Sequence, residues 1–211
     1  MATGQQTFQQ FAYDWEYSPS VSRLFGVFAL VAVFGWLVSM LLTAIHVFAL
    51  PAIPADAPVQ GSIEVITSQW AYVFGVPLAT LGAFYYLTTI GLALWWFDTR
   101  HPLIIKILTP ITATGVVASG YFVWLQLVPI GAICPFCMMS AAATVVLFGL
   151  ELIILQQSAT PAVSTMIDDI VPLLKQTNLA VIVFPLLVGL VSLLGLFVIP
   201  LLPLPDPVPF A

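Results

Sequence analysis

Two cysteines that stand three positions apart, Cys134 and Cys137, are the only cysteines in the chain. A Cys-x-x-Cys pair can close a small disulfide, and the free N–H groups at a helix N-terminus favour the thiolate form of one thiol. Pro135 suits a first helical turn, because its missing N–H is not needed there. An apolar run, 138–155, follows at once. We therefore predict that Cys134 caps a transmembrane helix, with Cys137 one turn inside it.

Metal and haem chemistry fit this pair less well than redox chemistry. A tetrahedral zinc site needs about four ligands, and the only histidines are His46 and His101, the second of which the topology below assigns to the opposite side of the membrane. Haem attachment needs a histidine directly after the second cysteine, where Met138 stands. We therefore predict a redox pair and no metal, with two inert buried thiols as the remaining alternative.

The composition is that of an integral membrane protein. Of 211 residues, 61% are hydrophobic and only 6% are charged, and the mean hydropathy is +1.11. Soluble domains carry about 25% charged residues. The net charge of −5 argues against binding to nucleic acid.

Apolar runs predict an all-α membrane fold with five spans, since about 20 residues cross the hydrocarbon layer as a helix. We place the spans at about 24–50, 77–97, 103–128, 135–155 and 180–202. The segment 62–74 is too short and too polar to span, and its apolar residues fall at helical spacing. It predicts a short amphipathic helix that lies in the interface between the first two spans.

The expected organisation is a four-helix transmembrane bundle with additions at both ends. We divide the chain into a cytoplasmic tail (1–23), the bundle (24–155), a cytoplasmic connector (156–178), a fifth transmembrane helix (179–202) and an external tail (203–211).

The few charged residues predict the orientation. With five spans, all the basic residues fall on one side, namely Arg23, Arg100, Lys106 and Lys175. Basic residues stay cytoplasmic, so we expect a multi-pass cell-membrane protein with its N-terminus inside and its C-terminus outside. The cysteine pair and the amphipathic helix then share the external, periplasmic-type face, where disulfides form and persist.

A second group of residues precedes the cysteine pair in a recognisable order. It consists of Ser68, the pair Trp70-Ala71, the run Gly75-Val76-Pro77, and Gly82 followed by Phe84, Tyr85 and Tyr86. Together with Cys134 and Cys137, this order and spacing resemble the vitamin K epoxide reductase family over about 24–155. In that family a loop cysteine comes six residues before the serine, and Gly-x-Pro marks bacterial forms.

The resemblance implies a bundle around a quinone of the ubiquinone or menaquinone type. By position, Cys137 faces the quinone ring and Cys134 exchanges with an incoming thiol. The implied quinone-binding residues are Ser68, Trp70, Phe74 and Tyr86. Interfacial aromatic residues also form belts, and serines also serve as packing contacts, so these alternatives stay open. A thioredoxin-like protein on the external face, on a separate chain, is the implied partner.

One departure from the family pattern is large. Members normally carry two relay cysteines in the first external loop, and this chain has none there. The second relay position falls on Ser62, and the first falls near 54–56. Three explanations compete. Ser62 could be an engineered trap, the protein could be a two-cysteine variant whose partner attacks Cys134 directly, or the protein could have lost turnover. We favour the second explanation.

The function that follows is a quinone-dependent thiol/disulfide oxidoreductase of the membrane, which supports disulfide formation in extracytoplasmic proteins. The alternative is a catalytically degenerate subunit of a larger membrane complex.

Overall fold

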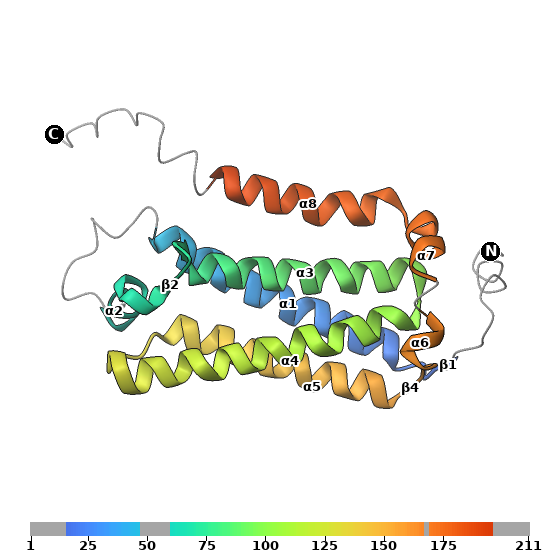
Figure 1. Cartoon of the computed structure of the whole chain (residues 1–211), viewed down its shortest axis with the longest axis horizontal. Helices are drawn as coiled ribbons and strands as arrows, with labels where there is room; N and C mark the ends of the chain where they lie inside the picture. The colour runs from blue at the N-terminus through green and yellow to red at the C-terminus, as the bar shows by residue number, and fades with distance from the viewer. Residues whose placement is uncertain (1–15, 47–59, 167–168, 196–211) are drawn as a thin grey trace.

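The computed structural model describes residues 16–46, 60–166 and 169–195 (Figure 1). The long helices are α1 (Val21–Ala44), α3 (Leu78–Thr99), α4 (Pro102–Leu125), α5 (Pro135–Gln156) and α8 (Leu179–Leu193). The short helices are α2 (Gln60–Thr67), the 3₁₀ turn η4 (Gln69–Ala71), the π turn η5 (Gln126–Ile130), α6 (Val163–Met166) and α7 (Ile170–Gln176). Two antiparallel strand pairs complete the fold, β1 (Glu16–Tyr17) with β4 (Ser158–Ala159), and β2 (Tyr72–Val73) with β3 (Val76–Pro77).

Four helices form the bundle. Helix α1 packs against α3 and α5, α4 packs against α5 and α3, and α8 runs along the outside of α3 (Figure 1). At one end lie α2, the β2–β3 hairpin and the start of α5, and we call this the disulfide end. At the other end lie α6, α7 and the β1–β4 pair, and we call this the basic end.

The predicted all-α membrane architecture is confirmed. Within the described residues, four helices are long and apolar enough to cross a membrane. The pair α7 and α8 meets the same criteria when taken together, although the two helices are bent by 87°. The predicted second to fourth spans match α3, α4 with η5, and α5 to within a few residues. Residues 1–15 of the predicted tail 1–23, the whole predicted tail 203–211 and the far ends of the first and fifth spans lie outside the described residues.

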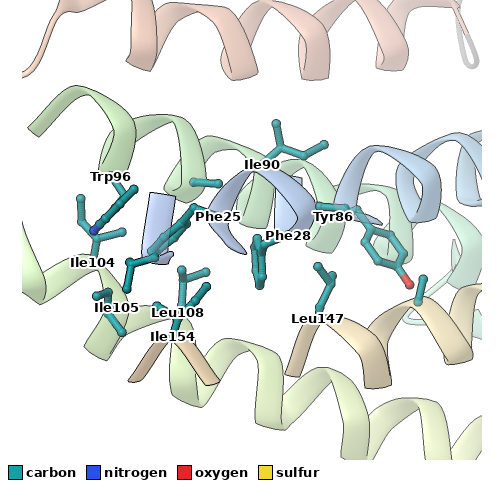
Figure 2. Packing of buried hydrophobic residues seen from close by; sticks show 14 residues of the cluster. Phe25, Phe28, Tyr86, Ile90, Trp96, Ile104, Ile105, Leu108, Leu147 and Ile154 are labelled. Atoms are coloured by element: carbon teal, nitrogen blue, oxygen red, sulfur yellow. The ribbon is translucent and has the colours of Figure 1, made fainter. Parts of the chain in front are cut away.

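The bundle core is apolar and aromatic, and it fills the half nearer the basic end. Phe25 of α1 stacks on Trp96 of α3, with ring centroids 3.9 Å apart, and both side chains are fully buried. Figure 2 shows side chains from all four bundle helices meeting around this stack, among them Ile104, Leu108 and Ile154. The close packing here leaves the disulfide half of the bundle as the place where a cavity can form.

Two bundle helices begin in the same way, with a capping side chain followed by proline. At α4, Nδ1 of His101 accepts a hydrogen bond from the N–H of Leu103, and Pro102 follows. At α5, the Cys134 side chain caps the helix and Pro135 follows. Both starts satisfy a free N–H of the first turn and use proline where no N–H is needed. The predicted cap at Cys134 is therefore confirmed.

The predicted amphipathic helix is shorter than 62–74. Helix α2 ends at Thr67, and two side chains there bond back to the helix: Thr67 donates to the carbonyl of Ile63, and Ser68 donates to that of Val65, each at 2.8 Å. Ser68 also adopts an extended backbone conformation. The chain then forms η4 and the β2–β3 hairpin, so the remainder of the predicted helix is a 3₁₀ turn and a strand.

The basic residues gather at the basic end, as the sequence predicts. Arg23 is in the first turn of α1, Arg100 ends α3, Lys106 is in the first two turns of α4, and Lys175 is in the last turn of α7. All four of these helix ends lie at the same end of the bundle in Figure 1.

Candidate redox site

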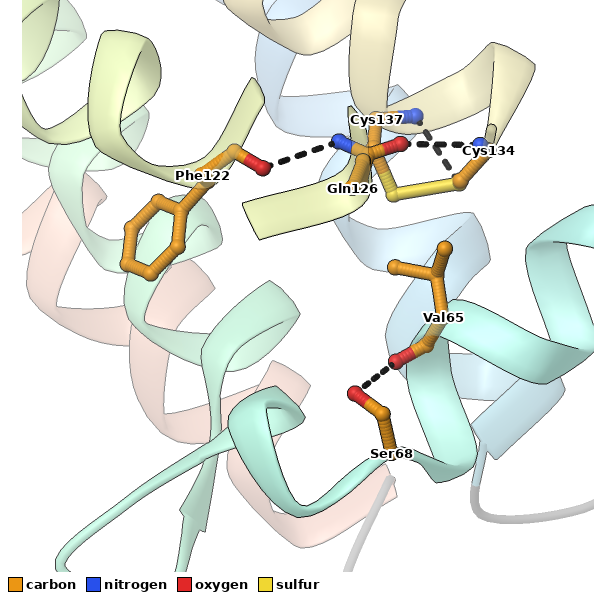
Figure 3. Close-up of a disulfide and its surroundings, with 6 residues drawn as sticks. All are labelled: Val65, Ser68, Phe122, Gln126, Cys134 and Cys137. Carbon is orange, nitrogen blue, oxygen red and sulfur yellow. Dashed lines mark hydrogen bonds between the residues drawn. A yellow bond between two sulfur atoms is a disulfide. The ribbon is translucent and has the colours of Figure 1, made fainter. Parts of the chain in front are cut away.

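Cys134 and Cys137 form a disulfide at the N-terminus of α5, with their Cα atoms 5.2 Å apart (Figure 3). The backbone N–H of Cys137 donates to Sγ of Cys134, with 3.1 Å between nitrogen and sulfur. Cys134 is fully buried, whereas Cys137 is only partly buried. The two sulfurs therefore have different surroundings although they share one bond.

Gln126 connects the end of α4 to this disulfide. Its side-chain Oε1 accepts a hydrogen bond from the backbone N–H of Cys134 at 2.8 Å, and its Nε2 donates to the carbonyl of Phe122 at 3.4 Å (Figure 3). The residue is 3% exposed and begins the π turn η5. Sequence analysis missed Gln126; the available signal was a polar side chain at the end of an apolar span, eight residues before the first cysteine.

A cavity of about 390 Å³ opens beside the disulfide. Its wall comes from α1, the segment from α2 to β3, α3, α4 and α5, and it is almost entirely apolar. Cys137 and Gln126 line it, whereas Cys134 does not. A cavity of this size and character is typical of small-molecule sites, which combine an apolar wall with a few polar groups.

Three of the four predicted quinone-binding residues line this cavity. Ser68 and Trp70 come from the segment that follows α2, and Tyr86 comes from α3. Phe74 is not part of the wall: it lies at the β2–β3 turn with a positive φ of 51°, and its side chain is fully exposed. The structure thus brings Ser68, Trp70 and Tyr86 together with Cys137 and leaves Phe74 outside.

The hydroxyl groups of Ser68 and Tyr86 already have protein partners. The Ser68 hydroxyl donates to the carbonyl of Val65 at 2.8 Å (Figure 3). The Tyr86 hydroxyl donates to the carbonyl of Ser140 at 2.6 Å and lies 2.8 Å from Oγ1 of Thr144. Tyr86 is 1% exposed, and its bonds to Ser140 and Thr144 tie α3 to α5 at the cavity wall.

Helix α2 covers the buried cysteine. Ile66 packs in one cluster with Cys134 and with Val38 and Leu42 of α1. At the start of α2, Gly61 lies so close to the carbonyl oxygen of Ile133 that a Cβ atom there would overlap it. Cys134 is consequently shielded from water by α2 and the loop that precedes α5.

Ser62, the position that replaces a relay cysteine, is in the first turns of α2. It is 1% exposed, and its hydroxyl has no hydrogen-bond partner among the described residues. The other predicted relay position, 54–56, falls in a segment that the structure does not describe.

His46, which follows α1, closes the cavity at the disulfide end. Its Nε2 lies 2.7 Å from the Tyr72 hydroxyl, and the ring also hydrogen-bonds the backbone of Ile66. The imidazole therefore links the end of α1 to both α2 and β2. Across residues 16–46, 60–166 and 169–195, no group of three or more His, Cys, Asp or Glu side chains could hold a metal ion.

Comparison with known protein families shows which family the chain belongs to. A model of the vitamin K epoxide reductase family matches residues 23–152, which include all four bundle helices almost completely. The chain belongs to this family. A search of curated proteins found no match. Vitamin K epoxide reductase family members are in general membrane oxidoreductases linked to quinones, so membership supports a redox function for the chain and disfavours a purely structural subunit.

The residues at the site fit a quinone. The cavity is apolar enough for the ring and the first part of an isoprenoid tail, a disulfide sulfur lies in its wall, and a buried amide is bonded to the same Cys-x-x-Cys turn. Cys137 is therefore the sulfur that can reach a molecule in the cavity, and Cys134 is the sulfur held on the far side of the bond.

Proposed function

We propose that this protein is a membrane thiol/disulfide oxidoreductase that couples the Cys134–Cys137 pair to the reduction of a ubiquinone- or menaquinone-type quinone, and so supports disulfide formation in proteins outside the cytoplasm. One observation carries the proposal: the disulfide borders an apolar cavity of about 390 Å³ in the wall of a membrane bundle, and Cys137 lines that cavity.

The chemistry divides between the two sulfurs. A partner thiolate attacks Sγ of Cys134, a new S–S bond forms between them, and Cys137 leaves as the thiolate. The partner's second thiol then displaces Cys134, which leaves the partner oxidised and the pair reduced. A quinone bound in the cavity supplies an acceptor for two electrons and two protons. The reduced pair gives up two electrons and two protons to this acceptor as the Cys134–Cys137 bond forms again.

The placement of the basic residues supports an external position for the disulfide. Since Lys and Arg residues near span ends stay cytoplasmic, the basic end faces the cytoplasm and the disulfide end faces outward. The external side is oxidising and holds the secreted proteins that need disulfides. In this orientation the N-terminus is cytoplasmic and the C-terminus is external.

A thioredoxin-like protein on the external face is the proposed partner. Because the chain has no loop cysteine, the partner must reach Cys134 directly, and this sulfur is fully buried beneath α2. The exchange therefore requires the start of α2, around Gly61 and Ser62, to move away from Ile133. We call this start of α2 the lid. In this reaction Ser62 is part of the lid that covers Cys134, and it takes no part in electron transfer.

The wall residues hold the ring beside Cys137. Trp70 and Tyr86 provide flat apolar surface, and the Tyr86 hydroxyl is fixed to α5 rather than pointed at a ligand. Ser68 donates its hydrogen to Val65, so its oxygen can accept but its one O–H is in use. We therefore assign Ser68 to shaping the wall.

Purified full-length protein in detergent micelles tests this function. With a reduced thioredoxin-like protein and a short-chain soluble quinone, we expect loss of quinone absorbance in the wild type, and none in Cys134→Ser or Cys137→Ser. The matched control is Met138→Ala, which changes an exposed neighbour of Cys137 and keeps both sulfurs. Quinone loss that does not depend on Cys137, or no loss at all, would reject the proposal.

A further inference from the structure

We propose that the side-chain amide of Gln126 donates a hydrogen bond to a carbonyl oxygen of the quinone, while the same side chain holds Cys134 in place. This assignment rests on the proposed function. It adds a binding residue that lies on α4, away from the group of wall residues that the sequence indicated.

The orientation of the amide follows from its two partners. The Cys134 N–H can only donate, so the atom that faces it must be Oε1; the Phe122 carbonyl can only accept, so the atom that faces it must be Nε2. An amide nitrogen carries two N–H bonds. The bond to Phe122 uses one of them at 3.4 Å, and the second is left for a molecule in the cavity that Gln126 lines.

Burial increases the energy gained when this second N–H donates a hydrogen bond. Gln126 is 3% exposed in a nearly apolar cavity, and a polar hydrogen in such surroundings gains more from a carbonyl partner than it would in water. The ring must lie near Cys137 to receive electrons, and Gln126 is bonded to the other half of the same Cys-x-x-Cys turn. One ring carbonyl therefore falls within reach of the amide.

Another candidate donor is the hydroxyl of Tyr85, which also lines the cavity and has no partner among the described residues. It lies seven residues into α3, about 10 Å along the helix axis from the start of that helix. Tyr85 is thus placed deeper in the bundle, whereas Gln126 is tied directly to the cysteine turn. The geometry favours Gln126 for the carbonyl beside Cys137.

The test measures quinone binding to the oxidised protein, so no turnover is involved. Quenching of tryptophan fluorescence by a short-chain quinone gives the Kd, since Trp70 lines the cavity. Gln126→Met removes both donor and acceptor, and we expect binding about tenfold weaker, the loss of one buried hydrogen bond. Gln126→Glu keeps an oxygen for the Cys134 N–H and, when ionised, has no donor. Its binding should be weak at high pH and recover as the carboxyl gains a proton.

Other titrating groups on the cavity wall define the usable pH range. In the oxidised protein these are His46, Tyr85 and Tyr86, and none of the three is expected to change charge between about pH 7 and pH 9. Wild-type binding should therefore be flat across that range. Gln69→Glu is the matched control, because Gln69 is exposed near the same end of the bundle and does not line the cavity.

A measurement on the wild type covers the case in which the variants do not fold. Hydrogen bonding lowers the infrared carbonyl stretch of a bound quinone, and ¹⁵N labelling of glutamine side chains should reveal a bound-state shift at Gln126. Binding unchanged in both Gln126 variants, or weakened only in Tyr85→Phe, would overturn the assignment. Absence of any quinone binding by the wild type would instead reject the proposed function.

Discussion

Tyr86 of α3 lies directly against Gly35 of α1, with its ring in the space that a Cβ atom at position 35 would occupy. Tyr86 is fully buried at the cavity wall, and Gly35 is buried opposite it. The shape of the cavity therefore depends on the absence of a side chain at one position in α1.

Gly35→Ala should destabilise the bundle and distort the cavity. The added methyl group must displace the Tyr86 ring or separate α1 from α3, and overpacking of this kind costs about 1–3 kcal/mol in unfolding free energy. Thermal unfolding in micelles and the Kd for quinone measure both effects. Gly26→Ala, on the same helix with open space around it, should leave the Kd unchanged and should not lower the unfolding temperature. Equal behaviour of the two variants would show that the contact has no importance.

Tyr86→Phe should loosen the link between α3 and α5 without creating a large void. It removes the hydrogen bonds to Ser140 and Thr144, and we expect a loss of about 1 kcal/mol in unfolding free energy. Tyr121→Phe, which removes an exposed hydroxyl on α4, is the control and should leave stability unchanged. The expectation fails if the Tyr86 variant unfolds at the wild-type temperature.

Gly61→Ala should make the disulfide easier to reduce. A methyl group at this position meets the carbonyl of Ile133, so the start of α2 must shift away from the loop that leads to Cys134. We expect a water-soluble phosphine to reduce the Cys134–Cys137 bond several times faster than in the wild type, as followed by mass-tagging of free thiols. Gly120→Ala, on the exposed face of α4, serves as the control.

A reduction rate unchanged by Gly61→Ala would argue that access to Cys134 does not depend on α2. A slower rate would mean that the added methyl group tightens the contact. The first result would remove the lid movement from the proposed reaction and leave the cavity chemistry unaffected, whereas the second would still mean that α2 controls access to Cys134.

The helices and the cysteine cap could be predicted because their causes are local. An apolar run of sufficient length marks α3 or α5 by itself, and a Cys134-Pro135 start satisfies the first turn whatever surrounds it. The end of α2 at Thr67 could not be predicted, since it depends on the extended backbone at Ser68 and on the β2–β3 hairpin that follows, whose pairing is a tertiary feature of the folded chain. The predicted helix therefore ran too far.

Two features of the site depend on contacts that spacing alone does not reveal. Gln126 reaches Cys134 only because the π turn η5 brings the end of α4 back toward α5. Phe74 faces outward because Phe74 and Gly75 both have positive φ at the hairpin turn, a conformation that Phe rarely adopts. A period-based interpretation placed Phe74 on the same face as Trp70, and the turn separates them.

His101→Asn should flatten the loss of stability at low pH. His101 is fully buried at the basic end, 3.7 Å from the carboxylate of Asp169. Burial lowers the pKa of His101 below its ordinary value of about 6.5, and Asp169 opposes this only in part. The unfolded chain therefore binds the proton more readily than the folded chain. The contribution of His101 is complete above about pH 6.5 and is lost as the pH falls toward the folded-state pKa.

Asparagine is the matched replacement, because its side-chain oxygen can accept the N–H of Leu103 that His101 now accepts, and it does not titrate. The unfolding temperature measured in micelles from pH 7.5 to pH 5 should decline less steeply in the variant. Parallel curves for the variant and the wild type would mean that the buried imidazole at the basic end does not control the acid sensitivity of the bundle.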